Sequence, residues 1–579
     1  MRTSVFFTLN GKLIELKNED VFLPLSDILR YQQRKTGTKV VCAEGDCGAC
    51  TVMIANTINN NDLKFKAINS CILTGFLADG MHIVTVEGLN KDNSINEVQD
   101  SMVRNFGGQC GFCTPGFVMA ITNMYEQKSK PSCQNIKNYL TGNLCRCTGY
   151  KPIIEAAQDV DENKHSKVSE LYNWEELTKK IKEKTSSPLL IESQAQSVYA
   201  PLTIQEAVDY LASTQNVRIF SGATDLGVQI NKGRKLESKK LSLHLIKELY
   251  EIKKENNKIS FGAKVTLHQF QELIEKEVPK LNDFFHIFAS PQIKNTATVV
   301  GNLANGSPIA DSTPTLMSLD AELTLMGSQG KRVVPLKNFY KDYKKFDLLQ
   351  DEIIYSVSFE IPNSNTKLGF YKVSQRRDLD ISCVNAAFAF EMSQDIITNA
   401  KITYGGVGPT TKRLQTVEKS FQGLKIQDLA KEANIKLIED NIAPISDVRG
   451  TKDFRIVVGK KLFEKFKIKY LFTNVSAIHP NRQVIILENG QRLPFDNLII
   501  ADGMVPAWDH IPGLNRSHNM VHSTMNADET MRAELGFKDF LHSPGPMTIA
   551  CAPGSMDYQS AYQYALNVDH VLRRYRLRD

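Results

Sequence analysis

The chain has 579 residues, which is too long for one hydrophobic core and predicts about four domains at roughly 150 residues each. With 42% hydrophobic and 23% charged residues, the composition argues against a disordered or a fibrous protein. The net charge of +6 is spread without a dense basic block, so nothing favours nucleic-acid binding. Residues 1–9 lack a signal-peptide pattern, and no apolar run approaches the ~18 residues of a membrane span, so we expect a cytoplasmic protein.

The cysteines are concentrated at one end of the chain. Nine of the eleven precede residue 150, and only Cys383 and Cys551 follow. Cytoplasmic thiols stay reduced, so this distribution indicates metal or redox chemistry rather than disulfides. Cys551 lies in the apolar sequence TIACAPG, which is typical of a buried strand residue.

The first cysteine motif follows a predicted β-hairpin over residues 4–15 that turns at the dipeptide Asn10-Gly11. The sequence VCAEGDCGACTV then has the spacing C-x4-C-x2-C, and a fourth cysteine follows in SCILTG. This is the spacing of plant-type 2Fe-2S ferredoxins, in which one loop supplies three thiolates and a separate segment supplies the fourth. Gly45 and Gly48 allow that loop to curl tightly. A structural zinc site is the alternative, although zinc sites usually repeat a short C-x2-4-C knuckle.

The second cysteine motif combines QCGFCTPGF and NLCRCTGY in the pattern C-x2-C-x31-C-x-C. Residues 116–127 and 151–160 have apolar residues at helical spacing, so we expect a small helical bundle with cysteines at helix ends. Helix N-termini there would stabilise an anionic cluster. Cys133 fits neither motif and is interpreted as a small structural side chain.

Beyond residue 165 the chain becomes polar, which predicts a linker that carries one exposed helix. The sequence RIFSGATDLGV follows as a short strand that runs into a glycine-containing turn. Such a turn can present backbone amides to a pyrophosphate. It is weak evidence alone, because no Rossmann fingerprint is present.

The two cysteine motifs together resemble the molybdenum hydroxylase family, and CAEGDCGACTV, QCGFCTPGF and GNLCRCTGY resemble its xanthine dehydrogenase branch. ASPQIKNTATVVGNLANGSPIADSTPTL resembles the FAD signature of that branch, and KITYGGVGPTTKRLQTVE resembles its flavoprotein C-terminal domain. The resemblance covers about four fifths of the chain. It implies a multidomain α+β fold with these domains: a β-grasp 2Fe-2S ferredoxin-like domain over 1–85, a four-helix 2Fe-2S domain over 86–165, a linker over 166–194, an FAD-binding domain over 195–365 and a C-terminal α/β flavoprotein domain over 366–468.

The resemblance also assigns cofactor roles to individual residues. Cys42, Cys47, Cys50 and Cys71 would hold a cluster nearer FAD. Cys110, Cys113, Cys145 and Cys147 would hold a cluster nearer a molybdenum cofactor, with Gln109 and Cys147 facing its pterin. Phe288 would lie against the flavin ring. The other implied FAD contacts are Ile219, Phe220, Ser221, Gly222, Ala223, Thr224, Asp225, Leu226, Thr298, Val299, Val300, Gly301, Asn302, Asp311, Ile354 and Lys372. Val300 stands where the family usually has glycine, so we expect it to crowd the approach of a phosphate.

Substrate oxidation is not expected on this chain, which has no room for the family's molybdenum domains. The resemblance implies a large molybdenum-cofactor partner in an (αβ)2 hetero-oligomer. It also implies that electrons from a hydroxylated purine pass through two 2Fe-2S clusters to FAD and then to NAD+. Two alternatives remain open: the same architecture serving an aldehyde or an aromatic acid, and a redox sensor or non-functional fusion product.

Residues 469–579 continue past the end of the resembled subunit. QVIILENGQRLPFDNLIIADG predicts a hairpin that turns at Asn489-Gly490 and a buried strand after it. With SPGPMTIACAPGSMDYQSAYQYALNVDHVLRR, the segment resembles a fragment of a sulfide:quinone oxidoreductase. No G-x-G-x-x-G precedes it, and Asp557 stands where that family places a redox cysteine. We therefore expect a partial α/β tail without catalytic function.

Overall fold

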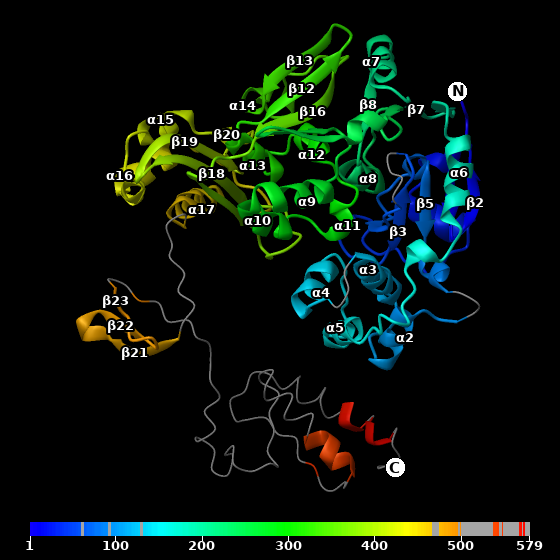
Figure 1. Cartoon of the computed structure of the whole chain (residues 1–579), viewed down its shortest axis with the longest axis horizontal. Helices are drawn as coiled ribbons and strands as arrows, with labels where there is room; N and C mark the ends of the chain where they lie inside the picture. The colour runs from blue at the N-terminus through cyan, green and yellow to red at the C-terminus, as the bar shows by residue number, and fades with distance from the viewer. Residues whose placement is uncertain are drawn as a thin grey trace. The chain divides into compact units, whose positions relative to one another are not determined.

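The structure is a computed structural model that describes residues 1–58, 63–90, 94–127, 131–465, 474–495, 498, 536–542, 547, 567–569 and 571–573 (Figure 1). It divides into two units, Met1–Lys469 and Tyr470–Asp579. The larger unit contains several sheets with helices packed on them, which confirms the predicted multidomain α+β fold. Among the described residues, no helix combines the length and the apolar character that crossing a bilayer requires.

The N-terminal part is a five-stranded sheet with the order β2-β1-β5-β3-β4, here called the ferredoxin-like sheet. β1 pairs in parallel with β5, and the other neighbours are antiparallel. The predicted hairpin is present between β1 and β2, because Asn10 and Gly11 have the two positive φ values, 49° and 77°, of a type I′ turn. The strands are β1 (Val5–Leu9), β2 (Lys12–Leu16), β3 (Thr51–Asn56), β4 (Lys66–Asn69) and β5 (Met81–Val84).

The next part is helical, as the apolar spacing predicts. Its most buried helix packs against β3 of the ferredoxin-like sheet, and a Cβ atom on Gly116 in that helix would lie 2.3 Å from the carbonyl oxygen of Gly48. The helix and the first cysteine loop are therefore in backbone contact, which only glycine permits at this position. The helices are α2 (Glu97–Arg104), α3 (Thr114–Gln127), α4 (Cys133–Leu140) and α5 (Lys151–Gln158), and α3 is the most buried one.

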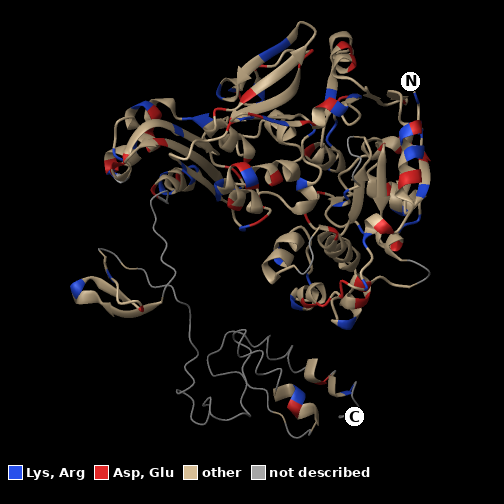
Figure 2. Ribbon diagram, in the orientation of Figure 1, with Lys and Arg blue, Asp and Glu red and all other residues tan. Residues whose placement is uncertain are grey.

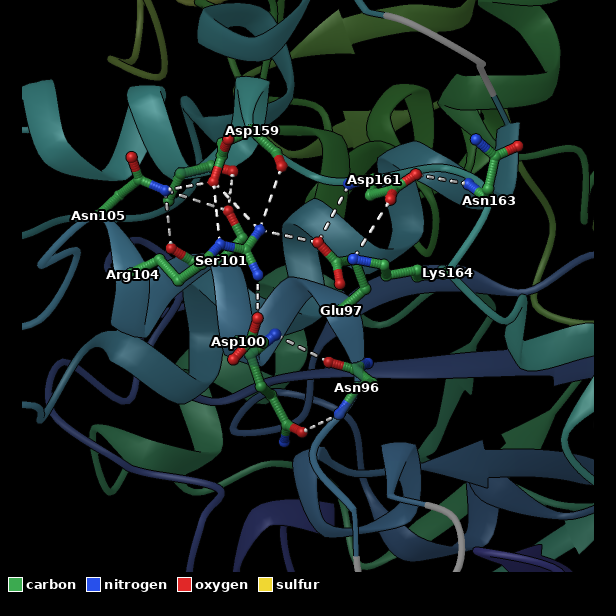
Figure 3. Close-up of polar contacts among 12 residues, drawn as sticks. Asn96, Glu97, Asp100, Ser101, Arg104, Asn105, Asp159, Asp161, Asn163 and Lys164 are labelled. Atoms are coloured by element: carbon green, nitrogen blue, oxygen red, sulfur yellow. Dashed lines mark hydrogen bonds and ion pairs between the residues drawn. The ribbon is translucent and has the colours of Figure 1, made fainter.

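A polar cluster joins the C-terminal ends of α2 and α5 (Figure 3). The Arg104 guanidinium donates to Asp159 Oδ2 over 3.1–3.2 Å and to Glu97 Oε1 over 2.8 Å. Asn105 Nδ2 donates to the same Asp159 oxygen over 2.9 Å, and Ser101 Oγ donates to the carbonyl oxygen of Ala156 over 2.7 Å. These contacts join the two helices that come before and after the second cysteine motif in the sequence.

The predicted linker contains one helix, α6 (Trp174–Lys184), along which basic and acidic side chains are interspersed (Figure 2). The helix was expected to be exposed, but Trp174 and Ile181 are buried. The Trp174 ring lies 4.9 Å from the ring of Phe65 and 4.8 Å from that of His82, centroid to centroid. Two apolar side chains are enough to pack this otherwise charged helix against the protein. Two such residues do not make a continuous apolar face in the sequence, so the pattern does not predict the burial.

The following part, predicted to bind FAD, contains two larger sheets that share a hydrophobic core, and a small sheet of β14 (Tyr340–Asp342) and β15 (Lys345–Phe346). One has the order β6-β7-β9-β8, and the other is the antiparallel sheet β10-β11-β16-β12-β13. Its strands are β6 (Leu189–Glu192), β7 (Ser197–Ala200), β8 (Val217–Phe220), β9 (Lys239–Ser242), β10 (Ile252–Glu255), β11 (Lys258–Gly262), β12 (Glu322–Gly327), β13 (Gly330–Pro335) and β16 (Ile353–Glu360). Its main helices are α7 (Ile204–Ser213), α8 (Thr224–Asn231), α9 (Leu267–Glu277), α10 (Asn282–Ile287), α11 (Pro291–Lys294), α12 (Val299–Asn305) and α13 (Ser312–Ser318).

The last part of the larger unit is an antiparallel sheet, β17-β18-β19-β20, with helices packed on it. Its core contains Phe388, Tyr404 and Phe421. The elements are β17 (Thr366–Val373), β18 (Val384–Ser393), β19 (Ile396–Gly405), β20 (Lys412–Arg413), α15 (Gln415–Phe421), α16 (Glu432–Asp440) and α17 (Lys452–Lys465).

In the smaller unit the described residues form a three-stranded sheet of β21 (Val475–His479), β22 (Val484–Leu487) and β23 (Arg492–Pro494). β22 and β23 form the predicted hairpin at Asn489-Gly490, where Gly490 has a φ of 80°. Most of the buried strand that was predicted to follow, together with Cys551 and Asp557, lies outside the described residues.

Candidate functional site

The structure brings together the four cysteines of the first motif. The thiol of Cys42 contacts the thiols of Cys47 and Cys71, and Cys71 also contacts Cys50. Cys50 and Cys71 are only 1% and 2% exposed. Asn69 Nδ2 points at Cys50 Sγ over 3.9 Å. The loop and the separate segment therefore meet as the spacing predicts.

The contacts within this group lower the pKa values of two thiols, Cys42 and Cys50. The pKa of Cys42 lies well below its usual value because Cys47 and then Cys71 donate hydrogen bonds to it, and the backbone amides of Glu44 and Cys47 add contacts of 3.4 Å each. The pKa values of Cys47 and Cys71 are raised, chiefly by the bond that each makes to Cys42. Amides directed at sulfur are the contacts that stabilise thiolates bound to iron.

The second motif also converges, but closer to the surface. Cys147 Sγ lies 3.6 Å from Cys110 Sγ, and both residues are exposed. Cys113, directly before α3, contacts Cys145, and burial followed by that contact raises the pKa of Cys113 to about 12. The amide of Thr148 donates to Cys145 Sγ over 3.4 Å.

The eight thiols therefore contact one another within two groups of four. Within the described ranges, no three His, Cys, Asp or Glu side chains are grouped so as to hold a single metal ion. A 2Fe-2S cluster takes two protein ligands on each iron. The contacts Cys42–Cys47, Cys50–Cys71, Cys110–Cys147 and Cys113–Cys145 supply four such pairs.

Helix α8 of the predicted FAD-binding part covers the first group of thiols. Asn231 Nδ2, at the end of α8, donates to the carbonyl oxygens of Ala43 and Cys71 over 2.8 Å each. A Cβ atom on Gly227 would lie 2.1 Å from the carbonyl oxygen of Ile72. The helix therefore lies directly against the backbone of the cysteine-bearing segment, and Gly227 permits this approach.

The two segments predicted to line the FAD diphosphate lie side by side. Ser221 Oγ is 3.2 Å from Thr298 Oγ1, and a Cβ atom on Gly222 would lie 2.2 Å from the carbonyl oxygen of Thr296. Ala223 is in the left-handed region, with a φ of 56°, and no described side chain caps the first turn of α8. Uncapped amides at the N-terminus of a helix favour anions such as phosphate. The chemistry of this turn therefore fits a diphosphate.

A second group of side chains in contact consists of Asp311, Lys372 and Phe288. The resemblance predicts that these residues contact other parts of FAD. Lys372 Nζ donates to Asp311 Oδ2 over 2.6 Å, with both side chains at most 5% exposed. The same ammonium lies 5.8 Å from the centroid of the Phe288 ring. Asp311 Oδ1 also accepts from Ser382 Oγ over 2.5 Å and from Asn385 Nδ2 over 2.7 Å. The sequence reading missed Ser382 and Asn385, which have no local motif.

Several other residues predicted to contact FAD pack in the protein core or bond to neighbouring helices. Ile354, on β16, and Val299 and Val300, on α12, belong to the hydrophobic core. Val300 is 5% exposed, so its side chain is packed in the core and does not extend into solvent beside the loop. The structure therefore gives no support for the expected crowding of a phosphate. Asn302 Oδ1 accepts from Ser312 Oγ over 2.5 Å, which joins α12 to α13.

Three family models match consecutive regions of the chain. A [2Fe-2S] binding domain matches residues 85–158, the FAD binding domain in molybdopterin dehydrogenase matches residues 192–364, and the CO dehydrogenase flavoprotein C-terminal domain matches residues 369–469. The second and third regions contain the two flavin contact groups described above.

Curated relatives match about three quarters or more of the chain. Xanthine dehydrogenase of Emericella nidulans is 29% identical over 487 residues, which cover 74% of this chain and 35% of the relative. Xanthine dehydrogenase/oxidase of Gallus gallus is 28% identical over 555 residues, which cover 81% of this chain and 40% of the relative. The chain thus spans less than half the length of these relatives.

Solved structures resemble part of the chain. A carbon monoxide dehydrogenase from Hydrogenophaga pseudoflava has 21% identity and a TM-score of 0.45, and quinoline 2-oxidoreductase from Pseudomonas putida 86 has 25% identity and a TM-score of 0.43. Each match covers 46% of this chain and more than nine tenths of the other. The chain thus contains consecutive regions that match a 2Fe-2S-binding domain, an FAD-binding domain and a flavoprotein C-terminal domain, and it is similar to xanthine dehydrogenases over about three quarters of its length.

Proposed function

We propose that this chain is the electron-transfer subunit of a xanthine dehydrogenase, which accepts electrons from a molybdenum-cofactor subunit and delivers them to NAD+. The observation that carries the proposal is the convergence of eight thiols into two separate groups, one of which lies under α8 beside the predicted flavin turn. Two one-electron carriers next to a flavin suit a chain that converts single electrons into a hydride.

The exposure of the two groups supports the direction of transfer. In the first group Cys50 and Cys71 are buried and Cys42 and Cys47 are partly buried, whereas Cys110 and Cys147 of the second group are exposed, and so is Gln109. In the sequence just before and within the second motif, Val103, Phe106 and Phe112 are 68%, 70% and 48% exposed. Exposed apolar side chains that gather at one place mark association surfaces. A partner that docks here would exchange electrons with the second group, and the first group would serve the flavin.

Each cofactor would be held by residues already described. The thiols of the first and second motifs would hold one cluster each, as the predicted ligands. The 219–226 and 298–302 segments, with Phe288, Asp311, Ile354 and Lys372, would hold FAD. When bound, the clusters carry single electrons and FAD exchanges one or two. The chain itself positions these groups, excludes water from Cys50 and Cys71, and directs amides at the sulfurs.

The partner and the cellular setting belong to the same proposal. The molybdenum cofactor would be on a large partner subunit, in an (αβ)2 assembly in the cytoplasm. The xanthine dehydrogenase relatives favour a purine as the substrate and NAD+ as the acceptor. The same proposal places the domain boundaries at residues 85, 165, 194, 365 and 468. It also assigns no catalytic function to the tail.

The first test is the cofactor content of the purified chain. We expect four irons, four sulfides and one FAD per chain, with two irons in each cluster. Cys47→Ser and Cys113→Ser should each remove one cluster and halve the iron content. The exposed Cys133, at the start of α4, provides the matched control, and Cys133→Ser should keep the full content. An unchanged iron content in either ligand variant would refute the ligand assignment.

The second test is the direction of electron flow. NADH alone should reduce the flavin, whereas xanthine alone should leave the isolated chain oxidised. Adding the large subunit should make xanthine a reductant. If a fully flavinated chain does not react with NADH, the acceptor is a different one. If the complex oxidises aldehydes or aromatic acids but no purine, the substrate assignment fails while the electron-transfer role remains.

A further inference from the structure

A cavity of about 190 Å³ lies between the ferredoxin-like sheet and the predicted FAD-binding part. Ile54 of β3 and Lys66 of β4 line one side, and His268 of α9 lines the other. Ser221 and Gly222, in the turn between β8 and α8, also contribute to the wall. A water molecule needs on the order of 10–15 Å³ of such space, so a small polyatomic ion fits with its hydration.

Lys264 presents an uncompensated ammonium to this cavity. The residue is 8% exposed, its Nζ donates to the carbonyl oxygen of Ser221 over 2.8 Å, and it lies 5.6 Å from the ring centroid of Tyr250. Within the described part of the chain, no carboxylate forms an ion pair with it, and burial lowers its pKa to about 8. A buried charge without a counter-charge is costly, and two of its three donors have no protein acceptor among the described residues.

The remaining charges of the cavity also favour an anion. Lys66 Nζ lies 2.8 Å from His268 Nε2, which in turn lies 3.4 Å from Glu272 Oε1. The contact with His268 and the nearby charges of Lys66 and Lys64 lower the pKa of Glu272 to about 2. The lining therefore has three lysines, Lys64, Lys66 and Lys264, against one carboxylate, an excess of two positive charges.

Two further side chains define the polar character of the walls. His244 lines the cavity, and its Nε2 faces Asp79 at 3.5 Å, where Arg2 also pairs with that carboxylate. Asn295 donates to the carbonyl oxygen of Ala67 over 2.8 Å, but its Oδ1 is buried without a partner. The walls thus offer several donors, and two buried polar atoms, His244 Nε2 and Asn295 Oδ1, have no hydrogen-bond partner among the described residues.

We propose that this cavity binds inorganic phosphate, with Lys264 as the main counter-charge. Hydrogen phosphate combines acceptor oxygens for the lysines with a hydroxyl that can donate to Asn295 Oδ1. Sulfate has the same shape and no hydroxyl at neutral pH, so it should bind more weakly. The site does not require flavin, because Lys66, His268 and Asn295 lie outside the predicted FAD contacts.

The test is a phosphate titration of the full-length protein, saturated with FAD, by isothermal titration calorimetry at constant ionic strength in chloride. We expect one saturable site per chain. Lys264→Met should weaken binding at least tenfold, because it removes a charge-assisted hydrogen bond. Lys66→Met and His268→Gln should weaken binding severalfold without changing the Ser221 contact. Lys280→Met, at an exposed lysine of the same part of the chain, should leave binding unchanged.

Several results would overturn the proposal. One is the absence of saturable binding to the wild-type chain. Another is equal binding by wild type, Lys264→Met and Lys66→Met, which would indicate general attraction to surface charge. A third is binding to flavin-free protein that FAD abolishes, which would place phosphate in the predicted diphosphate turn. The flavin content of each sample is measured separately, so a chain that fails to bind FAD is recognised independently of the phosphate result.

Discussion

Lowering the pH from 7.5 to 5.0 should loosen α6 from the ferredoxin-like sheet, because a buried histidine lies between them. His82, on β5, is fully buried. Its Nδ1 is 2.7 Å from Thr8 Oγ1 on β1, and its Nε2 is 2.9 Å from Thr178 Oγ1 on α6. Burial lowers its pKa from the ordinary 6.5 to about 4. The docked helix therefore holds His82 neutral.

The sign and size of the effect follow from proton linkage. Above pH 6.5 both the docked and the undocked state have neutral His82, and the full stability is present. As the pH falls below 6.5, only the undocked state takes up a proton, so docking is weakened until the folded pKa is reached. At pH 5.0 the loss is about 2 kcal/mol, roughly a thirtyfold change in the docking equilibrium.

Trp174, 4.8 Å from the His82 ring, provides the readout through its fluorescence. The chain has two tryptophans, so the assay uses a Trp508→Phe background, and hydrogen exchange of residues 174–184 gives a second measurement. His82→Gln keeps hydrogen-bonding capacity without titrating and should abolish this pH dependence. His286→Gln, at an exposed site, should retain it. An equal pH response in wild type and His82→Gln would refute the argument, provided that cluster absorbance shows that iron is retained.

Three other predictions follow. Lys372→Met should destabilise the region around Asp311 by about 3–5 kcal/mol in local opening, since it leaves a buried carboxylate unpaired, and it should reduce FAD content. Gly227→Ala should speed loss of iron from the first group and lower FAD content, because its methyl would press on the Ile72 carbonyl; cluster absorbance over time measures this. Truncation after Lys469 should leave iron content, flavin content and NADH reactivity intact.

The two substitutions each have a control within the chain. Lys367, on the same strand as Lys372, is exposed, so Lys367→Met should have no measurable effect on hydrogen exchange or flavin content. Gly408→Ala adds a methyl whose nearest neighbour is 3.7 Å away and should not affect the cluster. If Lys372→Met has the hydrogen exchange and flavin content of the wild type, the role of its ion pair with Asp311 is refuted. If Gly227→Ala loses iron no faster than the wild type, the role of the close approach to Ile72 is refuted. Loss of activity on truncation would show that the tail is functional.

The features predicted well from the sequence are those set by near neighbours in the chain. The Asn10-Gly11 turn needs two positive φ values, and the thiols that meet in a loop are only a few residues apart. Contacts between residues that are far apart in the chain leave no comparable pattern in the sequence. Ser382 contacts Asp311 across 71 positions, and Lys264 reaches the Ser221 carbonyl across 43. In the linker, burial of Trp174 depends on the partner ring of Phe65, which a helical pattern alone does not reveal.

The close fit of α8 over the first thiol group bears on the order in which the protein matures. Asn231 bonds to the carbonyls of Ala43 and Cys71, and Gly227 lies against Ile72, while Cys50 and Cys71 are almost inaccessible. An iron donor cannot reach these two sulfurs once the helix has settled. Because Cys42 and Cys47 remain partly exposed, we expect that only the last two iron–sulfur bonds, to Cys50 and Cys71, depend on iron arriving before α8 packs against this segment.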